Sequence, residues 1–145
     1  MRWSNCLSTY GLVFFGYGVL AAVVTIVARW PAQFGGPGDP ANVAQEFISR
    51  GTAAAPPLIP LLLLGGAALL VRHRGRWGIA AAILLLLLGV VFVIGGFGEI
   101  FAPDPATAPR VVLVLGGLIA AIGGLALASL GVAALLERLE RGADR

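Results

Sequence analysis

The sequence has few of the residues from which catalytic and metal-binding sites are built. Among its 145 residues there is no lysine, one cysteine (Cys6) and one histidine (His73). A single cysteine cannot form an intramolecular disulfide, and a lone histidine does not make a zinc site. The sequence also contains no G-x-S-x-G elbow, no phosphate-binding loop with its lysine, no H-E-x-x-H and no C-x-x-C. It therefore predicts a protein that is not an enzyme and holds no metal or cofactor.

Charged residues are also scarce. They make up 12% of the chain, against about 25% in an ordinary soluble domain, while 59% of the residues are hydrophobic. This balance predicts an integral membrane protein of a single domain. The net charge of +3 comes from arginines that flank apolar runs, so it does not indicate binding to nucleic acid. The use of arginine alone, with abundant alanine and glycine, is typical of a GC-rich bacterial genome.

Long uncharged runs predict four membrane-spanning helices. The clearest is residues 77–98, WGIAAAILLLLLGVVFVIGGFG, which contains no charged residue. A helix of this length rises about 30 Å, the thickness of the hydrocarbon core of a bilayer. The other predicted spans are residues 10–28, 57–71 and 110–136. The span over residues 10–28 is longer than the apolar region of a signal peptide, and no small-residue cleavage site follows it. We therefore expect a retained helix and not a cleaved signal peptide.

The segments between the spans predict two outer loops and one inner turn. Residues 29–54 begin with irregular glycine- and proline-rich sequence and continue as a short amphipathic helix over about residues 40–50. This helix is expected to lie among the lipid headgroups or to form a lid on the bundle. Residues 72–76 are so few that the spans they join must be antiparallel neighbours. Residues 99–109 form the second outer loop, and residues 137–145 form a cytoplasmic tail.

The distribution of arginine predicts the orientation. Seven of the ten arginines fall on the side of the two termini and the inner turn, and three fall on the other side. By the positive-inside rule, both termini are cytoplasmic and the protein is a multi-pass plasma-membrane protein. The inner turn holds three of these arginines, Arg72, Arg74 and Arg76. They are expected to set the orientation and to contact anionic headgroups, with docking of a cytoplasmic partner as the alternative.

The last predicted span carries a ridge of small residues. Gly116, Ala120, Gly124 and Ala128 are four residues apart and therefore share one helix face. In lipid, helices associate by close packing at such residues, because the lipid tails are as apolar as leucine. The ridge is predicted to pack an all-α, four-helix transmembrane bundle from within. The alternative is that it binds a second copy of the chain or another membrane protein.

Polar side chains are rare inside the predicted spans. Away from the ends they are Tyr17, Thr25 and Ser129, and the last two are expected to bond to their own helix backbone. Because no ionisable residue lies at mid-depth, a proton-coupled transporter or pump is not expected. Glu99, at the outer end of the third span, is the best single candidate for function. It is predicted to form an interface salt bridge with a cation on the same side, Arg110, Arg29 or Arg50, or to belong to a ligand or ion site.

Two classes of function follow. The leading hypothesis is a non-catalytic accessory, scaffold or self-assembling subunit, because the ridge is long and no catalytic constellation is present. The alternative is a pore or carrier for a small solute or lipid, with an outer entrance near Glu99 and the helix over residues 40–50. That alternative predicts an apolar cavity open to the outer side.

Overall fold

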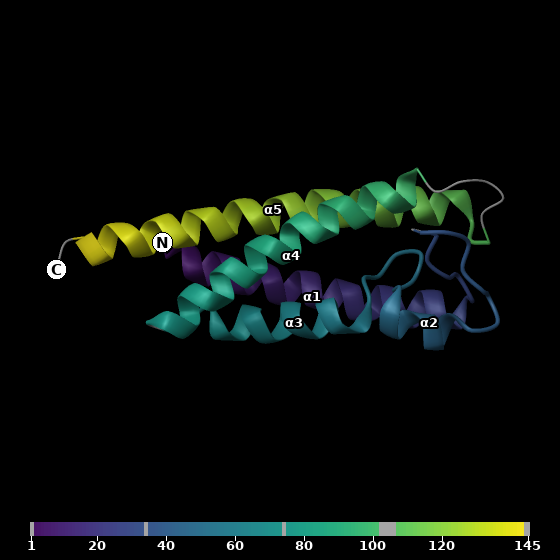
Figure 1. Cartoon of the computed structure of the whole chain (residues 1–145), viewed down its shortest axis with the longest axis horizontal. Coiled ribbons are helices and arrows are strands. Elements are labelled where there is room, and N and C mark those ends of the chain that lie inside the picture. Colours follow the sequence, from purple (N-terminus) through teal and green to yellow (C-terminus); the bar gives the residue numbers. More distant parts are fainter. Residues whose placement is uncertain (1, 34, 74, 102–106, 144–145) are drawn as a thin grey trace.

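The structure is a computed structural model that describes residues 2–33, 35–73, 75–101 and 107–143, and within these ranges it is all-helical. Its five helices are α1 (Trp3–Val27), α2 (Val43–Ser49), α3 (Leu58–Leu70), α4 (Arg76–Ile100) and α5 (Arg110–Ala143). Four of them lie lengthwise in a bundle in alternating directions (Figure 1). The short helix α2 lies at one end, the α2 end. The start of α1 and the end of α5 lie at the other, the terminal end.

Three of the helices, α1, α4 and α5, are long and apolar enough to cross a membrane. The fourth, α3, has 13 residues and rises about 20 Å, short of the roughly 30 Å of a hydrocarbon core. The predicted count of four spanning helices is therefore not established by helix length. This helix corresponds to the predicted span over residues 57–71. It begins at Leu58 because the two prolines before it, Pro56 and Pro57, follow a hydrogen-bonded turn rather than a helix.

Two other helices start at places that differ from the sequence prediction. α1 begins at Trp3, not near residue 10. Its polar first turns are supported by a contact with α3, because the hydroxyl of Ser8 donates to the carbonyl oxygen of Ala68 at 2.6 Å. α2 begins at Val43, not at residue 40. The carboxylate of Asp39 accepts hydrogen bonds from the backbone N–H of Ala41 at 2.8 Å and from the side-chain amide of Asn42 at 2.6 Å. This Asx turn replaces the expected first helical turn.

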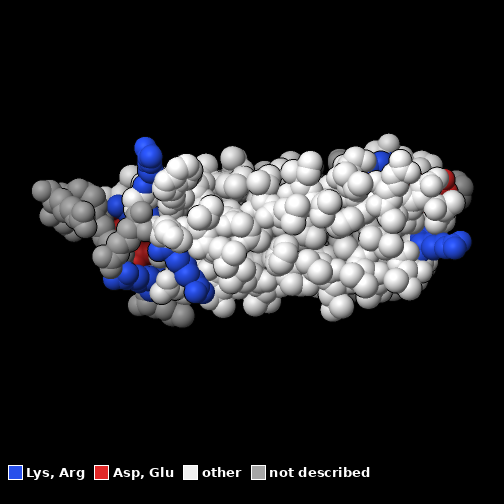
Figure 2. Space-filling view, turned by 90° about the horizontal axis from the view of Figure 1, so that it is seen from below, with Lys and Arg blue, Asp and Glu red and all other residues white. Residues whose placement is uncertain are grey.

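The surface of the bundle separates charge from apolar area. Figure 2 shows arginine and acidic residues at both ends of one face, with a broad belt between them that carries no charge. Large hydrophobic side chains stand exposed along the helices, among them Val13, Leu20, Ile122 and Leu125. Such an apolar belt between charged ends is typical of a surface that faces lipid tails.

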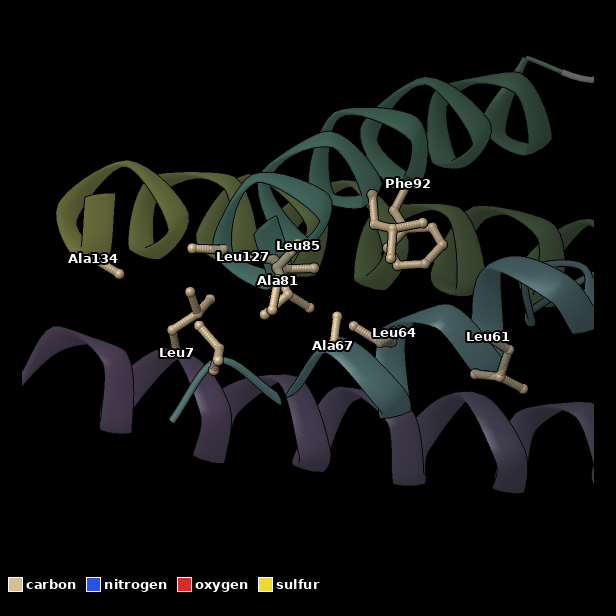
Figure 3. Packing of buried hydrophobic residues seen from close by; sticks show 12 residues of the cluster. Leu7, Leu61, Leu64, Ala67, Ala81, Leu85, Phe92, Leu127 and Ala134 are labelled. Atoms are coloured by element: carbon tan, nitrogen blue, oxygen red, sulfur yellow. The ribbon is translucent and has the colours of Figure 1, made fainter. Parts of the chain in front are cut away.

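Five leucines are fully buried, and four of them form one cluster with one member from each helix of the bundle. Leu7 of α1, Leu64 of α3, Leu85 of α4 and Leu127 of α5 are at most 1% exposed. Figure 3 shows these side chains directed into the space between the helices. At this level the four helices are joined into one core.

The pair α4 and α5 packs backbone to backbone through glycine. A Cβ added at Gly124 would lie 2.5 Å from the carbonyl oxygen of Gly89, and a Cβ at Gly96 would overlap the carbonyl oxygen of Gly117. Only glycine permits this approach, which is how helices gain contact area in lipid. The same two helices remain in contact from Gly89 to the α2 end.

At the terminal end, an arginine of α5 caps α3. The guanidinium of Arg138 donates to the carbonyl oxygen of Val71 at 2.6 Å and to that of His73 at 3.4 Å. These carbonyls belong to the end of α3 and the turn that follows, where helical partners are missing. The bond joins the last helix to the turn between α3 and α4, so it closes the bundle at this end.

Candidate functional site

A cavity of about 430 Å³ lies inside the α2 end of the bundle. All four long elements contribute to its wall, which is mostly apolar and includes Phe14, Tyr17, Leu61, Leu64, Phe92 and Ala120. Ligand sites in proteins typically measure about 300–1,000 Å³, and an apolar cavity of about 150 Å³ already holds benzene. The cavity is therefore large enough for a small organic molecule or part of a lipid chain.

The cavity exists because α3 and α4 diverge. Near the terminal end, Gly11 of α1 lies against both Ala68 of α3 and Leu85 of α4. Further along, α3 stays against α1, where Leu61 packs on Gly18. α4 instead follows α5, as Figure 1 shows. No single helix fills the space that opens between the two pairs.

Small residues keep this space empty. The walls from α4 and α5 include two glycine pairs, Gly95–Gly96 and Gly116–Gly117. A Cβ at Gly95 would meet no atom within 4 Å. Two exposed side chains of α4, Val91 and Ile94, also line the cavity, so it opens at the side of the bundle.

A tight turn before α3 forms the roof of the cavity. Residues 52–57 line it, and Ala53 and Ala54 rest on Gly116 of α5. The turn is closed by two bonds between Thr52 and Ala55, one from each backbone N–H, at 2.9 and 3.1 Å. Gly51 has φ +85°, and a Cβ there would lie 2.5 Å from the carbonyl oxygen of Ala55, so this position needs glycine.

The roof is tied to the end of α1. The hydroxyl oxygens of Thr25 and Thr52 are 2.7 Å apart, and both side chains are buried. The backbone N–H of Ala53 donates to the carbonyl oxygen of Trp30 at 3.2 Å. The roof is therefore held on one side by α1 and the segment after it, and on the other by contact with α5.

Glu99, the candidate from the sequence, lines the cavity at the end of α4. Its two carboxylate oxygens accept the backbone N–H of Gln33 at 3.1 and 3.0 Å. The Gln33 side chain is 2% exposed and donates to the hydroxyl of Thr107 at 2.7 Å. Glu99 thus fixes the loop after α1, and that loop in turn holds the start of α5.

Arg110 and Arg50 lie near this network. The guanidinium of Arg110 donates to the carbonyl oxygen of Ile100 at 2.9 Å, and the expected salt bridge between Arg110 and Glu99 stays a prediction. Arg50 lines the cavity, donates to the carbonyl oxygen of Gly36 and lies 3.8 Å from the carboxylate of Glu46. Arg50 is one of the three cations that the sequence places on the side of Glu99, and it lines the same cavity.

The ridge on α5 faces other parts of the same chain. Gly116 lies under the roof, Ala120 lies beside Gly96, and Gly124 and Ala128 lie against Gly89. These placements correspond to packing within the bundle, the first of the two roles that the sequence offered for the ridge.

The arginines of the turn between α3 and α4 stand at the terminal end. Arg72 is exposed and lies 3.5 Å from the hydroxyl of Thr9, and Arg76 lies over the ring of Trp77 at 5.5 Å. Arg74 lies outside the described residues. Among the described parts of the chain, there is no cluster of three or more His, Cys, Asp or Glu that could hold a metal ion.

The polar side chains within the helices show what sequence reasoning reached and what it missed. Thr25 bonds to the carbonyl oxygen of Ala21 at 2.6 Å and Ser129 to that of Leu125 at 2.9 Å, so their expected backbone bonds are confirmed. The partner of Ser8 on α3 was missed, since a single serine ahead of an apolar run gives no signal of a long-range bond.

The link between Gln33 and Thr107 was also missed. It joins two loops whose glycine and proline content indicates turns but not their partners. Comparisons of the chain with known protein families, with curated proteins and with solved structures found no match.

Proposed function

We propose that this protein crosses the plasma membrane four times and binds a small apolar molecule in the cavity at its outer, α2 end. The supporting observation is the cavity itself: it is apolar, it opens at the side of the bundle, and Glu99 and Arg50 lie on its wall. A cavity of this kind was the distinguishing expectation of a small-solute or lipid-handling protein. The proposal therefore favours that function over an accessory or self-assembling subunit.

The proposed fourth crossing is α3 together with the turn before it. The helix runs beside α1 in the reverse direction, and the roof continues its path toward the α2 end. Both chain ends then lie on the same, cytoplasmic side with most of the arginines. The helix alone is short, so the roof residues would occupy the outer part of the membrane, where their backbone groups are bonded within the protein.

The accessory-subunit hypothesis has less support than the binding function. Its motivation was a continuous ridge of small residues available to a partner. Gly124 of that ridge is buried against Gly89, and Gly116 is buried under the roof. The ridge is thus already occupied by the chain's own helices and gives no particular reason to expect a partner on that face.

A cavity-filling substitution tests the proposed binding. Gly95 lines the cavity with open space beside its Cα, so Gly95→Leu puts a side chain into the cavity without a clash. Gly66 of α3 also has open space beside it, is exposed and does not line the cavity, which makes Gly66→Leu the matched control. Both changes add the same side chain to the middle of a helix, where leucine is the better helix former.

The readout is the rise in the midpoint of thermal unfolding caused by a bound probe, 2-isopropylnaphthalene, in a mild detergent. A ligand that binds only the folded protein stabilises it according to its concentration and dissociation constant. We expect the wild type and Gly66→Leu to show the same rise and Gly95→Leu to show little or none. Equal responses of all three proteins would mean that the probe acts through the detergent, and the proposed binding would be wrong.

A further inference from the structure

The polar side chains on the cavity wall are few, and their partners can be named. Thr52 is bonded to Thr25 and Ala55, Glu99 to the backbone of Gln33, and Arg50 to the carbonyl oxygen of Gly36. Ser49 is exposed at the end of α2, where water can satisfy it. These four side chains therefore do not require a ligand.

Tyr17 of α1 is the exception. It lines the cavity, it is partly buried, and its hydroxyl has no hydrogen-bond partner among the residues that the structure describes. Tyr10 lies seven residues earlier in the same helix, and its hydroxyl donates to the carbonyl oxygen of Gly123 at 3.1 Å. A tyrosine hydroxyl in an apolar setting usually finds an acceptor, because leaving it unbonded costs free energy.

The ring of Tyr17 is held in place by its neighbours. It lies parallel to the ring of Phe14, with 3° between the planes and 6.1 Å between the centroids. Phe14 makes an edge-to-face contact with Phe92 of α4, with centroids 5.6 Å apart. The ring thus belongs to a packed aromatic row that crosses from α1 to α4, and this packing limits the positions that its hydroxyl can take.

We infer that the ligand of this cavity is an apolar molecule that carries one oxygen acceptor, a ketone, ester or hydroxyl oxygen, and that the Tyr17 hydroxyl donates a hydrogen bond to it. This inference rests on the binding function proposed above and adds the chemical class of the ligand. An apolar pocket with one or two placed polar groups orients its ligand through those groups. The apolar residues of the wall contribute contact area to the rest of the ligand.

The test uses two probes of nearly the same shape that differ in the acceptor. 2-Acetylnaphthalene has a ketone oxygen, and 2-isopropylnaphthalene has a methyl group in its place. Apparent dissociation constants are obtained from the dependence of the thermal unfolding midpoint on probe concentration. The ratio of the two constants is compared between the wild type and Tyr17→Phe, so that unequal partitioning of the probes into detergent cancels. Tyr10→Phe is the matched control. Tyr10 does not line this cavity, and its hydroxyl is already bonded within the protein.

We expect the preference of the wild type for the ketone to fall by about threefold to tenfold in Tyr17→Phe, the value of one neutral hydrogen bond. Tyr10→Phe should keep the preference of the wild type. An unchanged ratio in Tyr17→Phe, with binding of both probes still lost in Gly95→Leu, would overturn the inference and leave the binding function standing. Probe responses that are the same in Gly95→Leu and Gly66→Leu would instead overturn the binding function itself, and the inference with it.

Discussion

Thr25, in the last turn of α1, and Thr52, in the roof of the cavity, lie hydroxyl to hydroxyl at 2.7 Å although 27 residues separate them in the chain. Both side chains are at most 3% exposed. Thr25 also bonds to the carbonyl oxygens of Ala21 and Ala22 of its own helix, and Thr52 accepts the N–H of Ala55. One pair of hydroxyls therefore couples the end of a helix to the turn that covers the cavity.

Replacing Thr25 by valine should loosen the roof. Valine has the same shape but no hydroxyl, so the hydroxyl of Thr52 loses a buried partner, at a cost of about 1–3 kcal/mol in the free energy of unfolding. The measurement is thermal unfolding in a mild detergent. Ser129→Ala is the control, since the Ser129 hydroxyl is exposed and bonds to the carbonyl oxygen of Leu125 in its own helix. Its effect should stay within about 0.5 kcal/mol. Equal stability of Thr25→Val and the wild type would show that the hydroxyl pair does not hold the roof.

Replacing Glu99 should release the loop after α1. In the wild type, the backbone N–H of the buried residue Gln33 donates to both carboxylate oxygens of Glu99. Glu99→Ala removes this acceptor. A hydrogen bond to a charged group contributes about 1.5–3 kcal/mol, so we expect a loss of stability of that size. Glu99→Gln keeps one oxygen acceptor and should lose less.

Limited proteolysis provides a second readout for the Glu99 variants. Cleavage between residues 29 and 42 should become faster in Glu99→Ala than in Glu140→Ala, because Glu140 is exposed on α5 at the other end of the bundle. Equal cleavage rates in the two variants would contradict the role of Glu99 as the residue that fixes this loop.

Gly124→Leu should disrupt the pair α4 and α5. The new side chain would meet the carbonyl oxygen of Gly89 and the backbone nitrogen of Val93, and neither can move without shifting the helix. Because the obstacle is backbone, we expect a destabilisation above about 3 kcal/mol, beyond the usual range for overpacking. Gly66→Leu is the control, since nothing lies beside Gly66. Unfolding midpoints and gel-filtration profiles in detergent that are the same for both variants would show that the glycine contacts do not hold the pair together.

The sequence predicted the long helices well where uncharged runs end at charged residues or prolines. The run over residues 77–98 became α4, Arg76–Ile100, and the predicted start of the last span at residue 110 coincides with that of α5. The predicted first span begins at residue 10, whereas α1 begins at Trp3 and includes the polar residues Ser4, Asn5 and Ser8. Their helix is supported by a contact with α3 that the local sequence does not contain.

The candidate site was predictable only in part. Glu99 could be found because it is the first charge after a long apolar run. The cavity depends on the angle at which α4 leaves α3, and hydrophobic periodicity does not report that angle, because both the core face and the lipid face of each helix are apolar. The roof depends on bonds between distant residues, such as Thr25 with Thr52, and no short-range pattern specifies them.

The number of membrane crossings can be decided by labelling single cysteines. Cys6→Ser gives a background without cysteine, to which Asn5→Cys, Ser49→Cys and Glu140→Cys are added one at a time, all at exposed positions. With four crossings, the labels at residues 5 and 140 lie on the same side and the label at residue 49 lies on the other. With three crossings, in which α3 lies within one leaflet or on the surface, residues 5 and 140 lie on opposite sides.

A membrane-impermeant maleimide applied to intact cells is the measurement. We expect Ser49→Cys to react from outside and the other two variants to react only after the membrane is permeabilised, because seven of ten arginines accompany the two termini. The short α3 is then a crossing element, and its missing length is supplied by the roof. If Glu140→Cys reacted from outside while Asn5→Cys did not, α3 would not cross. Because α1 and α4 run in the same direction in the bundle, this outcome would contradict the arrangement of the four helices and therefore the cavity between them.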